Sequence, residues 1–328
     1  MIDTFDTDYS RDQISIVNGL LQRGHDITVL TSIYNDDGVI CKGEQLERLT
    51  RQPRIFRAPG VNIKIPGFKR LNIFLPNKAV VGDQYDVIHA YTFYTFSSVI
   101  SPIIKLLTRS GKLVMRAEIG PENYGATPNL AFTRAKRNRV YRRCLKLIDT
   151  YVEAFYTFTE RESEDLCKLD INKEKIWVVP IPVEPRFFNI GERLSSSKIT
   201  IGFLGRIIPG KGIHRIVKSL HMILKENQNV EVIFAGPKSD PQYSENVIRR
   251  LSNHKNFKYV GFLPNVDFFP LVDIVLVPSL YETGAKTVLE SMAAGRLVIA
   301  SDAYVMNEYI DHGATGLLFR DENDFFKL

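Results

Sequence analysis

Short apolar runs alternate along the chain with stretches whose apolar residues recur at helical spacing. The helical stretches include residues 13–24, 214–227 and 287–295. The short runs predict strands because they are rich in β-branched residues and are bounded by turn formers. The predicted strands are residues 26–32, 54–59, 86–91, 112–117, 154–159, 175–180, 198–205, 229–236, 256–262, 273–279 and 296–301. This alternation indicates βαβ units, and therefore parallel sheets joined by crossover helices.

Several of these strands are apolar throughout, which is typical of a sheet covered on both faces. Residues 181–198 separate the two series of strands and are rich in Pro, Gly, Ser and charge. We therefore predict an α/β protein with two Rossmann-like, doubly wound domains, residues 1–184 and 185–328, that face each other across a cleft. Only MIDTF would remain of a shortened first strand, and the second domain would be truncated at the start of a helix.

The composition narrows the class of protein without naming a function. The chain has 328 residues, of which 44% are hydrophobic and 24% charged, as in folded soluble proteins. It contains no apolar run of the ~18 residues that a membrane span needs, and its acidic start is unlike a secretory signal. The three cysteines, Cys41, Cys144 and Cys167, lack metal-ligand spacing, which favours a cytoplasmic protein. The net charge of +6 is compatible with an anionic ligand or an anionic surface.

The stretch GFLGRIIPGKG, residues 202–212, joins a predicted strand to a helix. Gly205 and Gly210 allow tight turns there, and Arg206 and Lys211 place two cations on the same loop. Because free N–H groups at a helix start attract anions, this loop is a candidate phosphate site. It does not match the Walker spacing, and an ordinary βα turn with solvated charges remains an alternative.

The stretch PSLYETGAKTVLE, residues 278–290, carries two glutamates eight positions apart. Glu282 lies among turn formers, and Glu290 lies inside the predicted helix. Glu282 either caps this helix or brackets a ligand together with Glu290, which could bind a vicinal diol through its two oxygens. The small residues Gly284 and Ala285 would permit close approach to the helix start. Taken alone, such a pair is more often solvated helix surface.

These motifs follow one another in a fixed order: GR…KG, the AG pair at 235–236, PS…E with a second glutamate, and MAAG before a strand. In this order they resemble glycosyltransferase family 4, a retaining family of GT-B architecture. In the first half, LLQRGHDITVLTS and YDVIHAY carry the resemblance, which thus covers nearly the whole chain. It implies a hexosyltransferase that moves a sugar from a nucleotide-diphosphate sugar to a glycan or lipid-linked acceptor.

The resemblance also implies a role for each donor-site residue. Arg206 and Lys211 would hold the donor diphosphate and neutralise the leaving nucleotide. Glu290 would bind the ribose hydroxyls, and Glu282 would touch the hydroxyls of the donor sugar. The remaining donor-site residues would be Gly205, Gly236, Gly284 and Ala285. No cofactor or metal is expected, because two cations and a helix start can stabilise the leaving group. Where the family commonly has E-x-F-G, this chain has ETGA.

The acceptor side of the sequence offers weaker candidates. His89 ends a predicted strand and would point toward the cleft, although a lone histidine at a strand end is more often structural. Glu118 stands near the position at which many family members carry a histidine, and Arg116 lies close by. We attribute the DTD triplet at residues 6–8 to chance rather than to a metal site.

Residues 133–155 are the one concentrated basic segment. Its apolar residues at helical spacing are Val140, Cys144, Leu147, Ile148, Tyr151 and Phe155. We favour a domain helix with a solvated charged face. The alternative is a peripheral surface that docks on anionic lipid at the inner face of a membrane, near a lipid-linked acceptor. No nucleic acid partner is expected, because no recognised module accompanies these charges.

Two other functions fit the same residues. A nucleotide-sugar epimerase of GT-B fold would act on the donor without any acceptor. A degenerate GT-B domain would bind a nucleotide or a partner without turnover. Donor hydrolysis and transfer assays distinguish these functions from glycosyl transfer.

Overall fold

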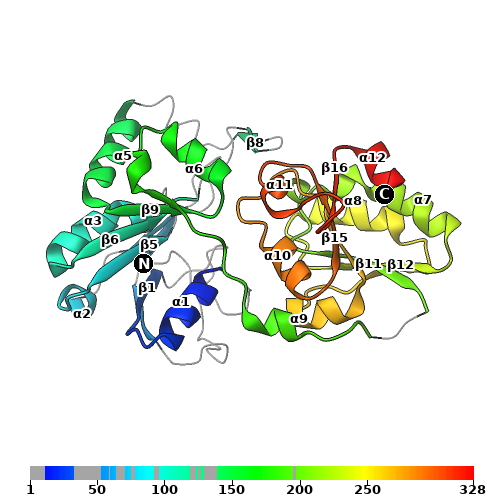
Figure 1. The fold of residues 1–328 in the computed structure, drawn as a ribbon, viewed down its shortest axis with the longest axis horizontal. Helices are drawn as coiled ribbons and strands as arrows, with labels where there is room; N and C mark the ends of the chain where they lie inside the picture. The colour runs from blue at the N-terminus through cyan, green and yellow to red at the C-terminus, as the bar shows by residue number, and fades with distance from the viewer. Residues whose placement is uncertain are drawn as a thin grey trace. The chain divides into compact units, whose positions relative to one another are not determined.

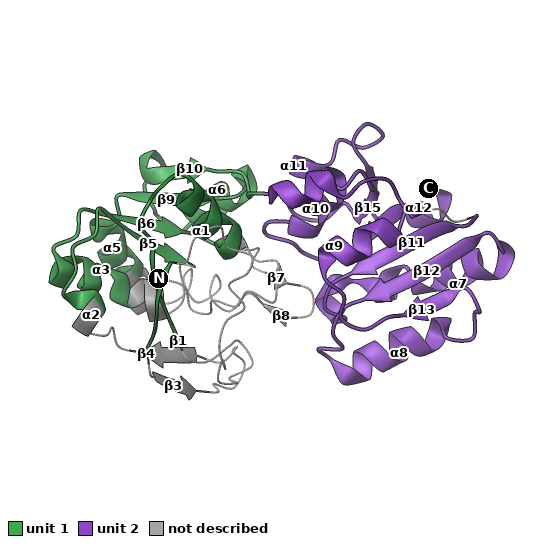
Figure 2. Cartoon of the chain, turned by 90° about the horizontal axis from the view of Figure 1, so that it is seen from below, with its two compact units in different colours: residues 1–122, 128–182 green, residues 123–127, 183–328 purple. Residues whose placement is uncertain are grey.

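The computed structural model describes residues 12–32, 53–58, 60–63, 71–74, 78–91, 96–118, 123–124, 127–128, 139–194 and 197–328. The DTD triplet at residues 6–8 lies outside them. The chain divides into two compact units, residues 1–122 with 128–182, and residues 123–127 with 183–328 (Figure 2). Each unit contains a parallel sheet and helices, as an α/β protein should. None of the described helices is long and apolar enough to span a bilayer.

The second unit is built on one parallel sheet of six strands (Figure 1). Its strands and helices are η2 (Pro185–Asn189), β11 (Ile199–Leu204), η3 (Pro209–Lys211), η4 (Ile213–Arg215), α7 (Val217–Glu226), β12 (Val230–Ala235), α8 (Pro241–Leu251), β13 (Phe257–Tyr259), α9 (Asn265–Phe268), η5 (Phe269–Leu271), β14 (Ile274–Val277), α10 (Lys286–Ala293), β15 (Leu297–Ser301), α11 (Met306–Tyr309), β16 (Leu317–Phe319) and α12 (Glu322–Lys327). The strand order, β13-β12-β11-β14-β15-β16, is that of a Rossmann fold.

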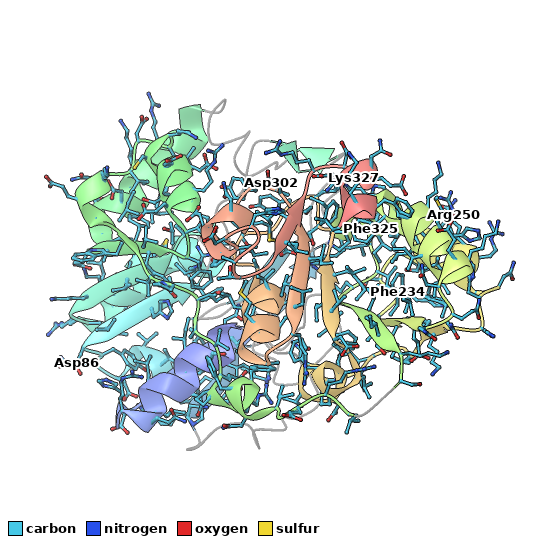
Figure 3. The ribbon with its side chains drawn as sticks, turned by 45° about the vertical axis from the view of Figure 1, so that its right-hand side comes forward. Asp86, Phe234, Arg250, Asp302, Phe325 and Lys327 are labelled. Atoms are coloured by element: carbon cyan, nitrogen blue, oxygen red, sulfur yellow. The ribbon has the colours of Figure 1, made fainter. Side chains whose placement is uncertain are left out.

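Both faces of this sheet are buried, and successive residues of each strand alternate between two cores. On β12, Val232 and Phe234 pack with α7 and α8, whereas Ile233 and Ala235 pack with α9 and α10. Figure 3 shows Phe234 inside the unit, whereas Arg250 points outward from α8. Burial on both faces explains why several of these strands, such as β14, are apolar throughout, as the sequence predicted.

The first unit carries the same kind of sheet in smaller form. Its elements are α1 (Asp12–Gln22), β1 (Thr28–Ser32), β2 (Arg54–Ala58), β3 (Gly60–Ile63), β4 (Leu71–Phe74), α2 (Lys78–Val81), β5 (Val87–Tyr91), α3 (Phe96–Thr108), β6 (Lys112–Arg116), β7 (Asn123–Tyr124), β8 (Thr127–Pro128), α5 (Arg139–Tyr151), β9 (Ala154–Thr157), α6 (Glu160–Cys167), η1 (Lys173–Lys175) and β10 (Ile176–Val178). Strands β10-β9-β6-β5 form one parallel sheet, and β1 pairs in parallel with β2. The hairpin β3–β4 is antiparallel.

Every strand range predicted from the sequence contains a strand of the structure. The prediction missed short strands such as β3, β4 and β16. The apolar stripe proposed for residues 133–155 was wrong in one respect. Leu145 and Ile148 are buried, whereas Leu147 is 62% exposed, because α5 faces the sheet with a different set of positions. Phe155 belongs to β9 rather than to this helix.

Candidate active site

The candidate donor site lies where the strand order of the second unit reverses. Strand β11 pairs with β12 on one side and with β14 on the other, although β12 and β13 intervene in the sequence. The chain therefore leaves β11 and β14 toward opposite sides of this strand pair. The loops at the carboxyl ends of the two strands start next to each other. In doubly wound sheets this is where ligands bind. These loops carry GRIIPGKG and PSLYETGA, the two stretches singled out from the sequence.

Backbone contact holds these two loops together. Gly212 has φ of 66°, and a Cβ at this position would lie 1.9 Å from the carbonyl oxygen of Pro278. Glycine is therefore required both for its backbone conformation and for the close approach. Beside this contact, the Leu280 N–H donates to the carbonyl oxygen of Gly210 over 3.0 Å. The residues between the two contact points, including Lys211, are thereby held against the β14 loop.

This contact brings Lys211 and Glu282 together across 71 positions of sequence. The Lys211 ammonium donates to Glu282 Oε1, and both side chains are mostly buried. The Ser279 hydroxyl also donates to Glu282 Oε1, over 2.7 Å. Ser279 is held in turn, since its carbonyl oxygen accepts from the Ser301 hydroxyl on β15. The carboxylate of Glu282 is thus fixed beside a cation, between the loops that follow β11 and β14.

Glu282 does not cap α10, which corrects one of the two sequence interpretations. The N-cap is Ala285, and no side chain caps the helix. Ala285 has φ of 41° and ψ of 39°, a left-handed conformation that costs a non-glycine residue free energy. Gly284 and Ala285 are both buried. Because the N-cap is an alanine, its side chain accepts no hydrogen bond from the first N–H groups of the helix, which begins at Lys286.

Glu290 is buried inside α10 and belongs to a polar group that the sequence analysis only partly identified. Asn265, at the start of α9, donates its side-chain amide to Glu290 Oε2. Lys286 lies one turn earlier on α10, with its ammonium 3.8 Å from Glu290 Oε1. The i, i+4 spacing of Lys286 and Glu290 was visible in the sequence. Nothing in the sequence signalled Asn265, because its contact depends on how α9 packs on α10.

Gly205 and Gly236 are the residues that directly follow β11 and β12. Their φ angles are 150° and 133°, and a Cβ on Gly236 would lie 2.0 Å from the Gly205 carbonyl oxygen. Arg206 follows directly and is exposed. No carboxylate of the described residues forms an ion pair with Arg206. The structure therefore joins Lys211 to Glu282 and leaves the Arg206 guanidinium on the same loop, open to solvent.

The acceptor-side candidates lie in the first unit: His89 is the central residue of β5, not its end as the sequence suggested, and Glu118 follows β6. His89 Nε2 is 2.8 Å from the hydroxyl of Tyr156 on β9. Burial lowers the pKa of His89 to about 3, so the imidazole is neutral near pH 7. A neutral imidazole has one nitrogen that donates a hydrogen bond and one that accepts. Its hydrogen bond to Tyr156 fits both a contact with a substrate and a structural role. Both interpretations from the sequence therefore stay open for His89.

Glu118 follows β6 and is half-buried, close to a buried ion pair that the sequence analysis missed. Arg116 Nη2 donates to both carboxylate oxygens of Glu162, over 3.0 and 3.1 Å. The N–H of Phe158 donates to the same carboxylate over 2.9 Å. Burial raises the pKa of Glu162 to about 7, against the opposing effect of Arg116, and Glu118 raises it further. Glu162 lies in TERESEDL, which by sequence resembles a solvated helix start.

Metal ligation has no candidate among the described residues. No three of their His, Cys, Asp or Glu side chains gather as metal ligands would. The donor-site residues themselves supply cations and hydrogen-bonding groups: Arg206, Lys211, the start of α10 and two carboxylates.

Two family models together match residues 14–325 of this chain. Residues 14–187 match the family model Glycosyltransferase Family 4, and residues 188–325 match Glycosyl transferases group 1. An uncharacterized glycosyltransferase of Methanocaldococcus jannaschii is 24% identical, over 94% of this chain and 80% of the relative. Alpha-monoglucosyldiacylglycerol synthase of Acholeplasma laidlawii is 20% identical, over 96% and 81%. The crystal structure of Anabaena HepE with UDP and glucose superposes with a TM-score of 0.70, at 14% identity, over 99% of this chain and 86% of that one.

Proposed function

Because the chain belongs to glycosyltransferase family 4 and has the GT-B fold, we propose that it is a retaining, metal-independent hexosyltransferase. Its donor would be a nucleotide-diphosphate sugar, and its acceptor a glycan or a lipid-linked sugar. The observation that carries this proposal is the pairing of Lys211 with Glu282 at the reversal of the strand order. The UDP and glucose bound to HepE, and the name of the Acholeplasma laidlawii synthase, support a nucleotide donor and a lipid acceptor.

Each donor-site residue has a proposed task. Glu290, oriented by Asn265, accepts hydrogen bonds from the two ribose hydroxyls. Arg206 and Lys211 bind the diphosphate, and the uncapped start of α10 adds N–H groups. Glu282 receives hydroxyls of the donor sugar once Lys211 turns from it toward phosphate. Gly205, Gly236, Gly284 and Ala285 line the site through their backbones.

The proposed reaction breaks the bond between the sugar C1 and the diphosphate oxygen and forms a bond from C1 to an acceptor hydroxyl oxygen. The hydroxyl proton is released, and the leaving group is a nucleoside diphosphate. Negative charge develops on that leaving group in the transition state. Cations and a helix start that already contact the diphosphate of the bound donor lower the free energy of this charge. On the acceptor side, His89 and Glu118 are the proposed contacts.

A nucleotide-sugar panel tests the donor proposal. We expect at least one UDP- or GDP-sugar to bind and to donate its sugar, and activity to persist in EDTA. Glu290→Gln keeps the shape of the side chain but removes its charge, so it should weaken nucleotide binding about tenfold or more. Isothermal titration calorimetry measures the affinity, and product NMR reports the anomeric configuration.

Glu245→Ala, an exposed change on α8, serves as the matched control and should leave affinity unchanged. If no donor binds and Glu290→Gln has no effect, the transferase proposal is wrong. Donor turnover to a new sugar nucleotide without any acceptor would instead identify an epimerase. Tight nucleotide binding without turnover would identify the non-catalytic domain.

A surface of the first unit supports the proposed peripheral membrane contact. On α3, Ile103, Leu106 and Leu107 share one face and are 53%, 59% and 56% exposed. Helix α5 lies beside α3 (Figure 1), and Lys105 on α3 donates to the carbonyl oxygen of Tyr151 on α5. Exposed on α5 are Leu147, Arg143 and Lys146. Large aliphatic side chains next to cations match the chemistry of an anionic lipid surface.

Vesicle sedimentation tests this contact. The protein should bind vesicles that contain phosphatidylglycerol and should bind phosphatidylcholine vesicles far less, since each basic residue near an anionic surface adds attraction. The double change Leu106→Glu and Leu107→Glu should lower binding at least about tenfold, because it removes apolar burial and adds repulsion. Leu194→Glu, at an exposed leucine of the second unit, should have no effect. Equal binding by all variants would contradict this surface.

A further inference from the structure

Lys238 is an exposed lysine that is held in place by an aromatic ring. Its ammonium lies 5.1 Å from the ring centroid of Tyr259. The Tyr259 hydroxyl donates to the carbonyl oxygen of Gly236 over 2.9 Å, so the ring itself is anchored. Cation–π attraction restricts the ammonium without neutralising it. None of the carboxylates in the described part of the chain forms an ion pair with Lys238, so the charge is available to a ligand.

The loop of Lys238 belongs to the same sheet edge as the candidate donor site. It leaves the carboxyl end of β12, next to the loop that leaves β11. The Ile207 N–H donates to the carbonyl oxygen of Pro237 over 3.0 Å, which joins the two loops directly. Arg206 and Lys238 therefore extend from neighbouring, hydrogen-bonded loops.

A single segment connects Lys238 to the proposed ribose site. Residues 259–265 begin at the ring under Lys238 and end at Asn265, the partner of Glu290. In between, the Gly236 N–H donates to the carbonyl oxygen of Gly261 over 2.6 Å. Phe262, in the same segment, is 53% exposed. With the ribose on Glu290 and the phosphates on Lys211, as proposed above, the base would lie along this segment, because the segment starts at Asn265 beside Glu290 and leads away to Tyr259.

We propose that Lys238 selects the base of the donor nucleotide. An ammonium can only donate hydrogen bonds. It therefore favours bases that carry a carbonyl oxygen at the edge far from the ribose, namely O4 of uracil and O6 of guanine. Cytosine and adenine carry an amino group at the same place, and an amino group facing an ammonium leaves both donors without an acceptor. This inference rests on the proposed function and narrows its donor to a uridine or guanosine diphosphate sugar.

Nucleotide affinities measured by calorimetry test this inference, with UDP, CDP, GDP and ADP as probes. Wild type should bind UDP at least about tenfold more tightly than CDP, and the tighter of the two purine nucleotides should be GDP. Lys238→Met keeps the apolar stem and should reduce the UDP preference to about twofold while leaving CDP affinity unchanged. Tyr259→Leu should lower the preference in part, because it frees the ammonium. Lys225→Met, at an exposed lysine of α7, is the matched control.

Equal affinities for UDP and CDP in wild type would overturn the inference. So would a Lys238→Met variant that weakens all four nucleotides alike, since Lys238 would then bind phosphate or ribose. Both results leave the proposed transferase function standing. Failure of that function gives a different pattern, in which no nucleotide binds wild type and Glu290→Gln changes nothing. Lys238→Arg, which retains donors at the site, should keep the order of preference and shows that loss in the methionine variant is not misfolding.

Discussion

Replacing Lys211 with alanine is expected to lower kcat about 10²- to 10³-fold, the usual cost of removing one fixed group that stabilises developing charge. The same change should weaken nucleoside diphosphate binding about tenfold or more, because a phosphate loses its paired cation. The two effects arise from one ammonium, that of Lys211. The Gly212–Pro278 contact holds the loop of Lys211 against the loop that follows β14. Steady-state kinetics with the best donor of the panel, together with calorimetry, measures both.

Lys211→Ala also leaves Glu282 without its cation. The single variant Glu282→Gln and the double variant Lys211→Ala/Glu282→Gln should therefore be measured alongside it. If the two residues act as one unit, the double variant loses no more activity than the more damaging single variant. Lys225→Ala provides a lysine control on the exposed side of α7 and should retain full activity. Unchanged kcat and unchanged nucleotide affinity in Lys211→Ala would remove Lys211 from the donor site.

Arg116→Ala is expected to be the most destabilising single change in the first unit, by about 3–5 kcal/mol of unfolding free energy. It leaves the Glu162 carboxylate buried without its cation, although the Phe158 N–H still donates to it. It also removes a guanidinium that lies 3.9 Å from the ring centroid of Phe158. Urea unfolding followed by a probe in the first unit measures the change, because a chain of two units need not unfold in one step.

The matched control is the exposed pair Arg54–Asp83, whose nitrogen and oxygen lie 2.9 Å apart. Arg54→Ala should cost at most about 1 kcal/mol, since solvent screens an exposed pair. Equal costs for Arg116→Ala and Arg54→Ala would contradict the burial argument.

The same pair has a pH dependence with a definite sign. The pKa of Glu162 rises from its ordinary value of 4.5 to about 7 in the folded state, so the folded state binds more protons than the unfolded state between these values. The stabilisation that comes from protonation of Glu162 in the folded state is therefore complete below pH 4.5. It is lost as pH rises toward 7 and stays lost above pH 7. Relative to Glu162→Gln, wild type should lose unfolding free energy over this window. A rise over the same window would show that Arg116, rather than burial, dominates the pKa.

Local sequence determined the strands, the helices between them and the order of the donor motifs. Strands such as β14, Ile274–Val277, are recognisable because both of their faces are buried, which favours apolar residues at every position. The sequence indicated Gly205 and Gly210 as turn residues, whereas the structure gives the positive φ angles to Gly205 and Gly212, and the close approach of Gly212 to Pro278 was not recognisable. Short strands such as β3 and β16 escaped prediction because three or four residues carry too little pattern.

Tertiary structure alone decided which side chains meet. Lys211 contacts Glu282 because the sheet order places β11 beside β14, and no local pattern encodes that order. Asn265 reaches Glu290 through the packing of α9 on α10. Glu162 is buried against Arg116, although its surroundings in sequence are those of a solvated helix. Periodicity reports which face of an element is covered, whereas the partner that covers it depends on contacts between residues far apart in the chain.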